Sequence, residues 1–310
     1  MNNLTAPNLL ADLLRVRLGD AVQANVSLAP YTSARIGGPA DVMVTVKSAD
    51  ELAEAVTTLN ALGLKFILLG GGSNVLVSDQ GVREVVVLNR AKEIRFDHGD
   101  QPKVWAEAGA TFSQVSQRAA SKGLSGLEWA ATIPGSVGGA VYGNAGAFGS
   151  DVAHDLISAE LLTEQGRADW PVEKLGYGYR TSILKRGDVQ GIVISAQFRL
   201  KNATKEAVSV KIKEFSARRK ASQPSGASMG SMFKNPAGDS AGRLIEAAGL
   251  KGTRLGNAEI STVHANFFIN HGETRASDIR ALIELAQKTI EEKFNVKLEL
   301  EIELVGDWNM

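Results

Sequence analysis

The sequence predicts an α+β protein of about two domains, and three observations lead to that prediction. The chain has 310 residues, which is enough for about two domains of ordinary size. Helical patterns with capping residues alternate with short apolar strands, and residues 157–200 are rich in strands. The composition changes after the predicted helix over 206–220, which indicates a second domain. We assign the helix to that domain and place the boundary just before it, near 202–204.

Composition excludes several classes of protein. Lys+Arg equals Asp+Glu at 34 each, so no overall basic field is available to hold nucleic acid. The absence of cysteine excludes disulfides, thiolate metal sites and cysteine nucleophiles. The four histidines show no ligand spacing, so we expect no metal. Without a signal-peptide pattern or a bilayer-spanning stretch, we expect a cytoplasmic protein with no membrane partner.

Periodicity and capping residues predict the individual elements. In order, these are an amphipathic helix over 8–18, a strand over 41–46, a helix opened by a Ser48–Glu51 capping box and closed by Gly63, strands over 64–69, 82–88 and 104–107, a helix capped by Thr111 and Gln114 that ends at Gly123, a strand over 192–200, and a helix over 206–220. The last region predicts a compact α/β unit of helix 240–248, strand 265–270, helix 277–294 and strand 296–305.

Three consecutive glycines, Gly70 to Gly72, stand between two apolar runs and are followed by Ser73 and Asn74. Glycine permits positive φ angles and lets a ligand lie directly against main-chain N–H groups. The stretch is typical of an anion cradle, most often for phosphate, and also of a tight hairpin. No P-loop lysine follows and no Rossmann fingerprint is present, so a nucleotide site here must be of another kind.

A second glycine cluster spans residues 133–149 and carries no charged side chain. Such a segment is either buried or covered by a ligand. Close helix packing through small residues is one interpretation. We favour a ligand wall, because Pro134 and the repeated glycines oppose a regular helix.

Three polar segments are candidates for chemistry. Arg180 has the fork geometry to pair with a carboxylate or an enolate, although a surface arginine would give the same sequence. Ser231 can donate a proton if its hydroxyl is aimed, but turn and cap serines are common. Alternation along the last strand puts Glu299, Glu301 and Glu303 on one face, either in a cleft or on a solvated outer surface.

Seven motifs occur in an order that resembles the UDP-N-acetylenolpyruvoylglucosamine reductase (MurB) family of peptidoglycan precursor synthesis. They are residues 31–40, 69–74, 133–140, 144–146, 179–182, 230–236 and 264–266. The resemblance covers nearly all of the chain after the N-terminal helix. It implies an FAD-binding region of the vanillyl-alcohol-oxidase (PCMH) type with two subdomains, then a C-terminal α/β substrate-binding domain. The expected boundaries are 1–29 for the N-terminal helix, 30–202 for the FAD-binding domain and 203–306 for the C-terminal domain.

The resemblance also implies a reaction. NADPH would reduce FAD, and the reduced flavin would deliver hydride to the enolpyruvyl double bond of UDP-N-acetylglucosamine enolpyruvate, giving UDP-N-acetylmuramate. By resemblance, Arg180 stabilises the developing enolate, Ser231 donates the proton and Glu301 works beside Arg180. Because cysteine is absent and Ser73 stands where a histidine would be needed to attach the flavin, we predict non-covalent FAD.

The resemblance assigns further residues to binding. The cofactor-binding set is Arg35, Gly70, Gly71, Gly72, Ser73, Asn74, Ile133, Pro134, Gly135, Ser136, Gly138 and Gly139. The substrate-binding set is Tyr179, Lys220, Asn235 and Asn266.

The chain departs from the family pattern at three positions. Glu303 stands where the final strand commonly has arginine, which puts in doubt a contact near flavin or substrate. Ala34 replaces a larger residue, and Thr132 replaces the usual glycine. The length resembles the shorter class of the family, which lacks an added loop with a substrate-clamping tyrosine.

Two other functions stay open at this point. One is an FAD oxidase of the same fold that acts on a sugar or an alcohol. The other is a non-catalytic flavin- or nucleotide-binding module. The presence of Arg180, Ser231 and Glu301 argues against the second.

Overall fold

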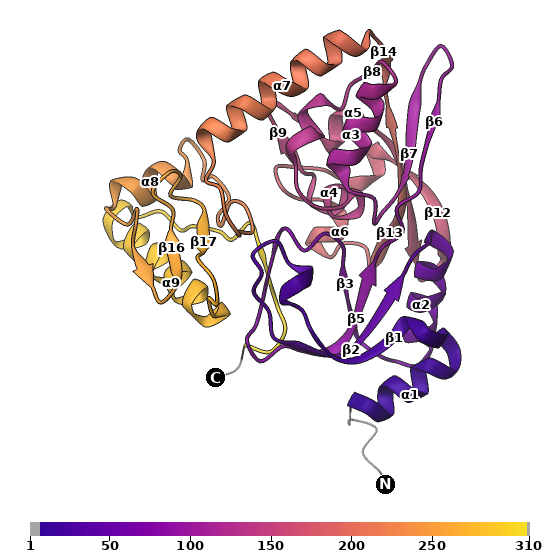
Figure 1. The fold of residues 1–310 in the computed structure, drawn as a ribbon, viewed down its shortest axis with the longest axis horizontal. Helices are drawn as coiled ribbons and strands as arrows, with labels where there is room; N and C mark the ends of the chain where they lie inside the picture. The colour runs from indigo at the N-terminus through magenta and orange to yellow at the C-terminus, as the bar shows by residue number, and fades with distance from the viewer. Residues whose placement is uncertain (1–6, 309–310) are drawn as a thin grey trace.

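The computed structural model describes residues 7–308, which form three packed regions (Figure 1). The N-terminal region is a four-stranded sheet in the order β1-β2-β5-β3. Its elements are α1 (Pro7–Leu18), β1 (Val22–Ser27), β2 (Pro39–Val46), α2 (Ala49–Ala61), β3 (Phe66–Leu69) and β5 (Val82–Asn89). Strand β5 is parallel to both β2 and β3, and successive residues along β5 are buried on both faces, as expected of a central parallel strand.

Helix α2 confirms the predicted capping box. The Ser48 side chain accepts a hydrogen bond from the Glu51 N–H at 3.1 Å, and Glu51 Oε2 accepts one from the Lys47 N–H at 2.7 Å. Gly63, with φ of +65°, ends the segment as expected. The apolar face of α2 packs with α1 on one side of the sheet, against Val44 and Val85.

The second region is a five-stranded antiparallel sheet in the order β12-β11-β13-β7-β6. Its strands are β6 (Ile94–Asp97), β7 (Lys103–Glu107), β11 (Leu156–Thr163), β12 (Gly166–Pro171) and β13 (Gly191–Arg199). Its helices are α3 (Phe112–Ser121), η3 (Glu128–Thr132), α4 (Val137–Gly143), α5 (Val152–Asp155), η4 (Val172–Leu175) and α6 (Ile183–Arg186). The core between them centres on Phe112, whose ring lies 5.2 Å from that of Phe198 and 5.6 Å from that of Trp129, between ring centroids.

Two local predictions in this region are only partly correct. Thr111 is the N-cap residue of α3, as predicted, but its side chain makes no capping bond; its main chain forms an isolated bridge with Ser136. The second glycine cluster does contain a helix, α4. Pro134 lies before the helix, where it interrupts no helical hydrogen bond. Ser136 caps α4 by accepting a hydrogen bond from the Gly139 N–H at 3.4 Å.

The C-terminal region is reached through α7 (Lys205–Ser222), a long helix that spans from the second region to the third (Figure 1). The region contains α8 (Ala241–Ala247), β15 (Arg254–Leu255), β16 (Ala258–Ile260), β17 (Phe268–Asn270) and α9 (Ala276–Phe294). The three strands form an antiparallel sheet, and α8 and α9 contribute apolar residues to a core that also holds Phe233 and Phe268.

The predicted last strand over 296–305 is regular only at its end, β18 (Glu303–Val305). Residues 296–302 have no continuous partner strand, although alternation still buries Leu298 and Ile302 in the C-terminal core. The chain then returns to the N-terminal region, where β18 pairs in parallel with β4 (Val75–Val77) (Figure 1). The short strand β4 directly follows the triple glycine, so the end of the chain lies against the first glycine loop.

Candidate active site

A cavity of about 500 Å³ is lined by residues from all three regions. That volume is within the range of small-molecule sites, which is about 300–1,000 Å³. Main-chain-rich segments form one wall, which we call the glycine wall: residues 70–74, 133–136, 138 and 139. Polar side chains form the other, which we call the charged wall: Arg180, Lys185, Arg219, Ser231, Glu301 and Glu303.

The glycine wall is built by close contact between backbones. A Cβ atom at Gly71 would lie 2.6 Å from Gly135 Cα, and one at Gly72, where φ is +60°, would lie 2.1 Å from the Tyr31 carbonyl oxygen. The hairpin interpretation is wrong, because β3 pairs with β5 and β4 pairs with β18. Only glycine allows these loops to meet.

Part of the glycine wall also leaves room on the cavity side. A Cβ atom at Gly139 would meet only Ser136 Oγ, at 3.6 Å. The wall presents uncharged main chain without bulky side chains, which is the surface that a dinucleotide pyrophosphate requires. These residues therefore fit FAD as the bound group.

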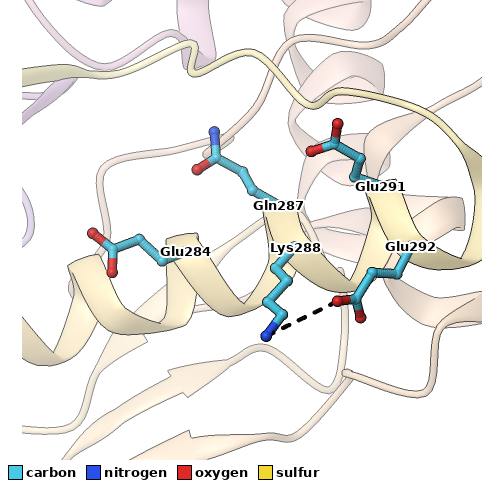
Figure 2. A pocket seen from close by; sticks show the side chains of 5 residues that line it. All are labelled: Glu284, Gln287, Lys288, Glu291 and Glu292. Atoms are coloured by element: carbon cyan, nitrogen blue, oxygen red, sulfur yellow. Dashed lines mark ion pairs between the residues drawn. The ribbon is translucent and has the colours of Figure 1, made fainter.

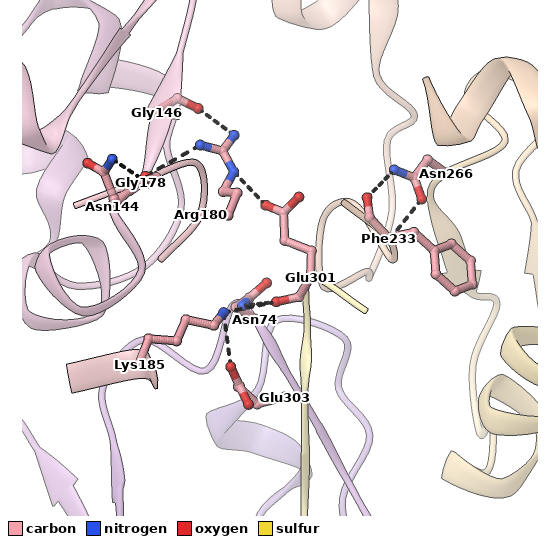
Figure 3. A network of polar contacts seen from close by, with 10 residues as sticks. All are labelled: Asn74, Asn144, Gly146, Gly178, Arg180, Lys185, Phe233, Asn266, Glu301 and Glu303. Carbon is pink, nitrogen blue, oxygen red and sulfur yellow. Dashed lines mark hydrogen bonds and ion pairs between the residues drawn. The ribbon is translucent and has the colours of Figure 1, made fainter. Parts of the chain in front are cut away.

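Arg180 is placed in the charged wall by a strained turn. Its φ is +55°, a left-handed conformation that costs a non-glycine residue about 1–3 kcal/mol. Its Nε donates to Glu301 Oε1 at 2.9 Å, and its Nη2 donates to the Gly146 carbonyl at 2.9 Å (Figure 3). Only 25% of the Arg180 side chain is exposed, so the surface-arginine alternative is wrong.

Glu301 is fixed by its backbone as well as by Arg180. Its N–H donates to the Met232 carbonyl at 2.9 Å, and its carbonyl accepts from Asn74 Nδ2 at 2.9 Å. The Asn74 side chain, predicted to bind cofactor, is thus bonded to the segment that bears Glu301 (Figure 3). The bond to Met232 also joins Glu301 to the loop that carries Ser231.

Ser231 lies on an extended loop after Gly230, whose φ is +79°. Its backbone bridges to Phe267, which orients the loop toward the cavity. Within residues 7–308 the Ser231 hydroxyl has no hydrogen-bond partner. A lining hydroxyl without a protein partner is available to a ligand.

The three predicted glutamates diverge in role. Glu299 pairs with Lys234 at 3.3 Å and is 75% exposed, so it matches the solvated-face interpretation. Glu301 and Glu303 line the cavity and pair with Arg180 at 2.9 Å and Lys185 at 3.0 Å. The line of three carboxylates is thus neutralised pairwise.

Arg219 differs from the other cations of the charged wall. It stands in the last turn of α7 and has no carboxylate partner in the part of the chain that the structure describes. Burial lowers the pKa of its guanidinium below the ordinary value. A desolvated, unpaired cation in a cavity is suited to an anionic ligand.

Several predicted site residues do not line the cavity. Arg35 is exposed, and so are Tyr179 and Lys220. Asn235 accepts a hydrogen bond from the Ala241 N–H at the start of α8. Asn266 is buried and binds the main chain of Phe233 through both of its side-chain atoms, at 2.8 and 2.9 Å, supporting the Ser231 loop (Figure 3).

Sequence reasoning missed Lys185 and Arg219 as lining residues, whereas the position of Glu303 was expected near flavin or substrate. Lys185 lies in the same segment as Arg180, a signal that could have been used. Arg219 is the neighbour of the predicted Lys220. On a helix, adjacent residues point about 100° apart, so the choice between them depends on the orientation of α7.

A second hollow, of about 420 Å³, follows the outer face of α9 (Figure 2). Its lining residues all come from that helix and are Glu284, Gln287, Lys288, Glu291 and Glu292. Arg280, Lys288 and Lys297 neutralise three of the carboxylates, which is typical of a solvated helix face.

Other predicted absences can be compared with the described residues. Over residues 7–308, no group of three or more His, Asp or Glu side chains is placed to hold a metal ion. In the same range, no helix combines the length and apolar character needed to cross a membrane.

The cavity combines an uncharged main-chain wall with paired acids and bases, and together with the family matches it places the chain in the class of FAD-binding oxidoreductases. Residues 40–169 match the FAD binding domain family, and residues 222–305 match the UDP-N-acetylenolpyruvoylglucosamine reductase C-terminal domain. The chain belongs to the UDP-N-acetylenolpyruvoylglucosamine reductase family, and it is an FAD-dependent enzyme.

Individual relatives agree over nearly the whole chain. The chain is 45% identical to the reductase of Chloroflexus aggregans over 92% of its own length and 97% of the relative's. It is 40% identical to that of Bacillus subtilis over 94% and 97%. The crystal structure of the reductase (MurB) from Thermus caldophilus matches with a TM-score of 0.78 at 38% identity, covering 92% and 98% of the two chains. These matches confirm the predicted fold class.

Proposed function

We propose that this protein reduces UDP-N-acetylglucosamine enolpyruvate to UDP-N-acetylmuramate with NADPH, as its family membership indicates. The observation that carries the proposal is that Arg180, Ser231 and Glu301 line the same cavity as the glycine wall. Bound FAD would supply the redox chemistry, taking hydride from NADPH and passing it to the enolpyruvyl double bond.

Arg180 would stabilise the charge that develops during reduction. Hydride addition to the enolpyruvyl group places negative charge on the carbon conjugated to the carboxylate, and the charge spreads to the carboxylate oxygens. A preorganised cation lowers the free energy of that transition state. The contacts of Arg180 with Glu301 and with the Gly146 carbonyl hold the guanidinium before substrate arrives, so little reorganisation is needed.

Ser231 would complete the reaction by donating a proton to that carbon. A general acid must come within about 3 Å of the atom it protonates. The Ser231 hydroxyl is available for this role, since no protein group in the described residues forms a hydrogen bond with it. Glu301 would work beside Arg180, bridged through that guanidinium to the developing enol.

Arg219 would bind phosphate groups of the nucleotide ligands. NADPH and the UDP-sugar are both anionic, and Arg219 is the lining cation that lacks a carboxylate partner among residues 7–308. Contacts of substrate with Tyr179, Lys220, Asn235 and Asn266 stay predictions, as do cofactor contacts of Arg35 and the domain boundaries at 29/30 and 202/203. We further propose a cytoplasmic enzyme whose partners are small molecules.

An anaerobic titration tests the proposed function. The purified protein should be yellow, lose its flavin absorbance with NADPH, and regain it with UDP-N-acetylglucosamine enolpyruvate. A protein that stays colourless after FAD addition would contradict the flavin assignment. Bleaching without re-oxidation by this substrate would favour another flavin enzyme.

A further inference from the structure

Glu303 stands where the family resemblance leads one to expect an arginine, and the structure gives it a partner. Its Oε1 lies 3.0 Å from Lys185 Nζ at the cavity (Figure 3). Lys185 is only 14% exposed and Glu303 is 45% exposed. Lys185 comes from α6 in the second region, and Glu303 begins β18 at the end of the chain, so this ion pair links two parts of the molecule.

The pair borders the backbone of Glu301 directly. Lys185 Nζ also lies 3.5 Å from the Glu301 carbonyl oxygen. The Glu303 N–H donates to the Asn74 carbonyl at 2.9 Å, and Asn74 Nδ2 donates to the Glu301 carbonyl. The segment 301–303 is therefore tied to the loop after the triple glycine and to α6 together.

This attachment matters because Glu301 and Arg180 reach the cavity from different regions. The Glu301 carboxylate meets Arg180 only if its backbone stays docked against β4 and α6. Because Glu303 is half exposed, the ion pair contributes modestly to overall stability. The nearly buried Lys185 ammonium nevertheless needs a carboxylate there, and a like charge would push β18 away.

We propose that Lys185 and Glu303 are positioning residues, whose ion pair seats β18 so that Glu301 meets Arg180. This inference rests on the proposed reduction of the enolpyruvyl substrate. Neither side chain acts on the substrate itself. Their effect is to hold Glu301, so it belongs to the substrate step and not to the reduction of the flavin by NADPH.

Charge reversal tests the pair. Lys185→Glu and Glu303→Lys are made singly and together, and each anaerobic half-reaction is followed at the flavin absorbance. Each single reversal should slow re-oxidation by saturating substrate roughly tenfold or more, while bleaching by NADPH stays within about threefold of wild type. The double variant restores an opposite-charge pair, and it should recover re-oxidation to within about threefold of wild type.

Glu299→Lys is the matched control. Glu299 lies two residues before Glu301, pairs with Lys234, and does not line the cavity. Reversing its charge should leave both half-reactions within about twofold of wild type. If a reversal variant does not fold, Lys185→Met and Glu303→Gln replace it, and the expected slowing is again confined to the substrate step.

Three results would overturn the inference. The first is full re-oxidation by Glu303→Lys alone, which would mean that a cation at this position serves equally well. The second is a double variant no faster than the slower single variant. The third is equal loss in both half-reactions, which would indicate a general structural role. Failure of the proposed function is distinguishable, because wild type itself would then not be re-oxidised by the substrate.

Discussion

The two walls of the cavity are built in opposite ways. The glycine wall comes from two short segments, 70–74 and 133–139, that meet main chain to main chain and carry no charged side chain. The charged wall is assembled from side chains far apart in sequence, such as Arg180, Ser231 and Glu301, which are brought together by ion pairs and by the return of the last strand.

This difference suggests that the glycine wall binds the cofactor and the charged wall carries out the substrate step. Uncharged main-chain groups can hold an anionic cofactor. In the substrate step, by contrast, donation of a proton and stabilisation of the developing charge require side chains. Changes at the closely packed positions of the glycine wall, such as Gly71 and Gly72, should therefore affect cofactor binding and folding together. Changes to Arg180, Ser231 or Glu301 in the charged wall should leave the bound flavin in place and slow the substrate half-reaction.

The largest effect is expected for Gly72→Ala. Its Cβ would lie 2.1 Å from the Tyr31 carbonyl oxygen at a φ of +60°, so the loop must move. We expect a loss of stability of about 3 kcal/mol or more and purification without flavin. Thermal unfolding and the 450 nm region of the absorbance spectrum measure both.

Gly139→Ala is the matched control for the glycine wall. Its added methyl group meets only Ser136 Oγ at 3.6 Å, so the fold should be intact. Weaker FAD binding with unchanged unfolding of the FAD-free protein would place the cofactor against Gly139. Unchanged FAD affinity would contradict a cofactor contact there.

Arg180→Gln should have the next largest effect. Loss of the guanidinium removes the cation proposed to stabilise the enolate, which we expect to slow re-oxidation by substrate about 10²–10³-fold. Bleaching by NADPH should change much less. A rate of re-oxidation near that of wild type would contradict the proposed role of Arg180 in the substrate step.

Arg219→Gln should raise the KM of NADPH and of the UDP-sugar by roughly tenfold each, with the difference shrinking at high salt. Lys220→Gln removes the same charge from the adjacent, exposed position of α7, and it should have the smaller effect. The reverse order would favour the sequence-based assignment of Lys220.

The smallest effect concerns the support of the Ser231 loop. Burial lowers the pKa of His264 below 6.5, and its Nδ1 accepts a hydrogen bond from the Asn266 N–H at 3.2 Å, which requires the unprotonated nitrogen. Below about pH 6.5 the unfolded chain binds a proton that the folded protein resists, so stability should fall as pH decreases. Urea unfolding across that range should show a shallower decline for His264→Gln.

The glycine wall could be predicted from sequence because the residue type itself indicates that another backbone or a ligand approaches closely. At Gly71 and Gly72 only glycine avoids collision, so the composition of the segment reveals close approach even before the partner is known. Helices with local caps, such as α2 with Ser48, were predictable as well, because their stabilising contacts lie within a few residues.

The charged wall was only partly predictable, because its contacts are not local. The predicted last strand is wrong over 296–302, because alternation in the sequence does not show whether a partner strand lies alongside. Strand β4, which is more than 200 residues away, pairs only with 303–305. The roles of Arg180, Ser231 and Glu301 are predicted by the family motifs. The ion pair between Lys185 and Glu303 is a contact between distant segments that no sequence pattern predicts. Asn266 was assigned to substrate, but its bonds are to the backbone of Phe233.

Ser231→Ala, followed anaerobically through both half-reactions, is the most direct test of whether the catalytic side chains of the charged wall act in the substrate step alone. The hydroxyl has no protein partner within residues 7–308, so its removal should leave the fold, the bound flavin and bleaching by NADPH intact. Re-oxidation by UDP-N-acetylglucosamine enolpyruvate should fall by roughly 10²-fold or more, because only that step needs the proton. Equal loss in both half-reactions, or re-oxidation at the wild-type rate, would contradict the account.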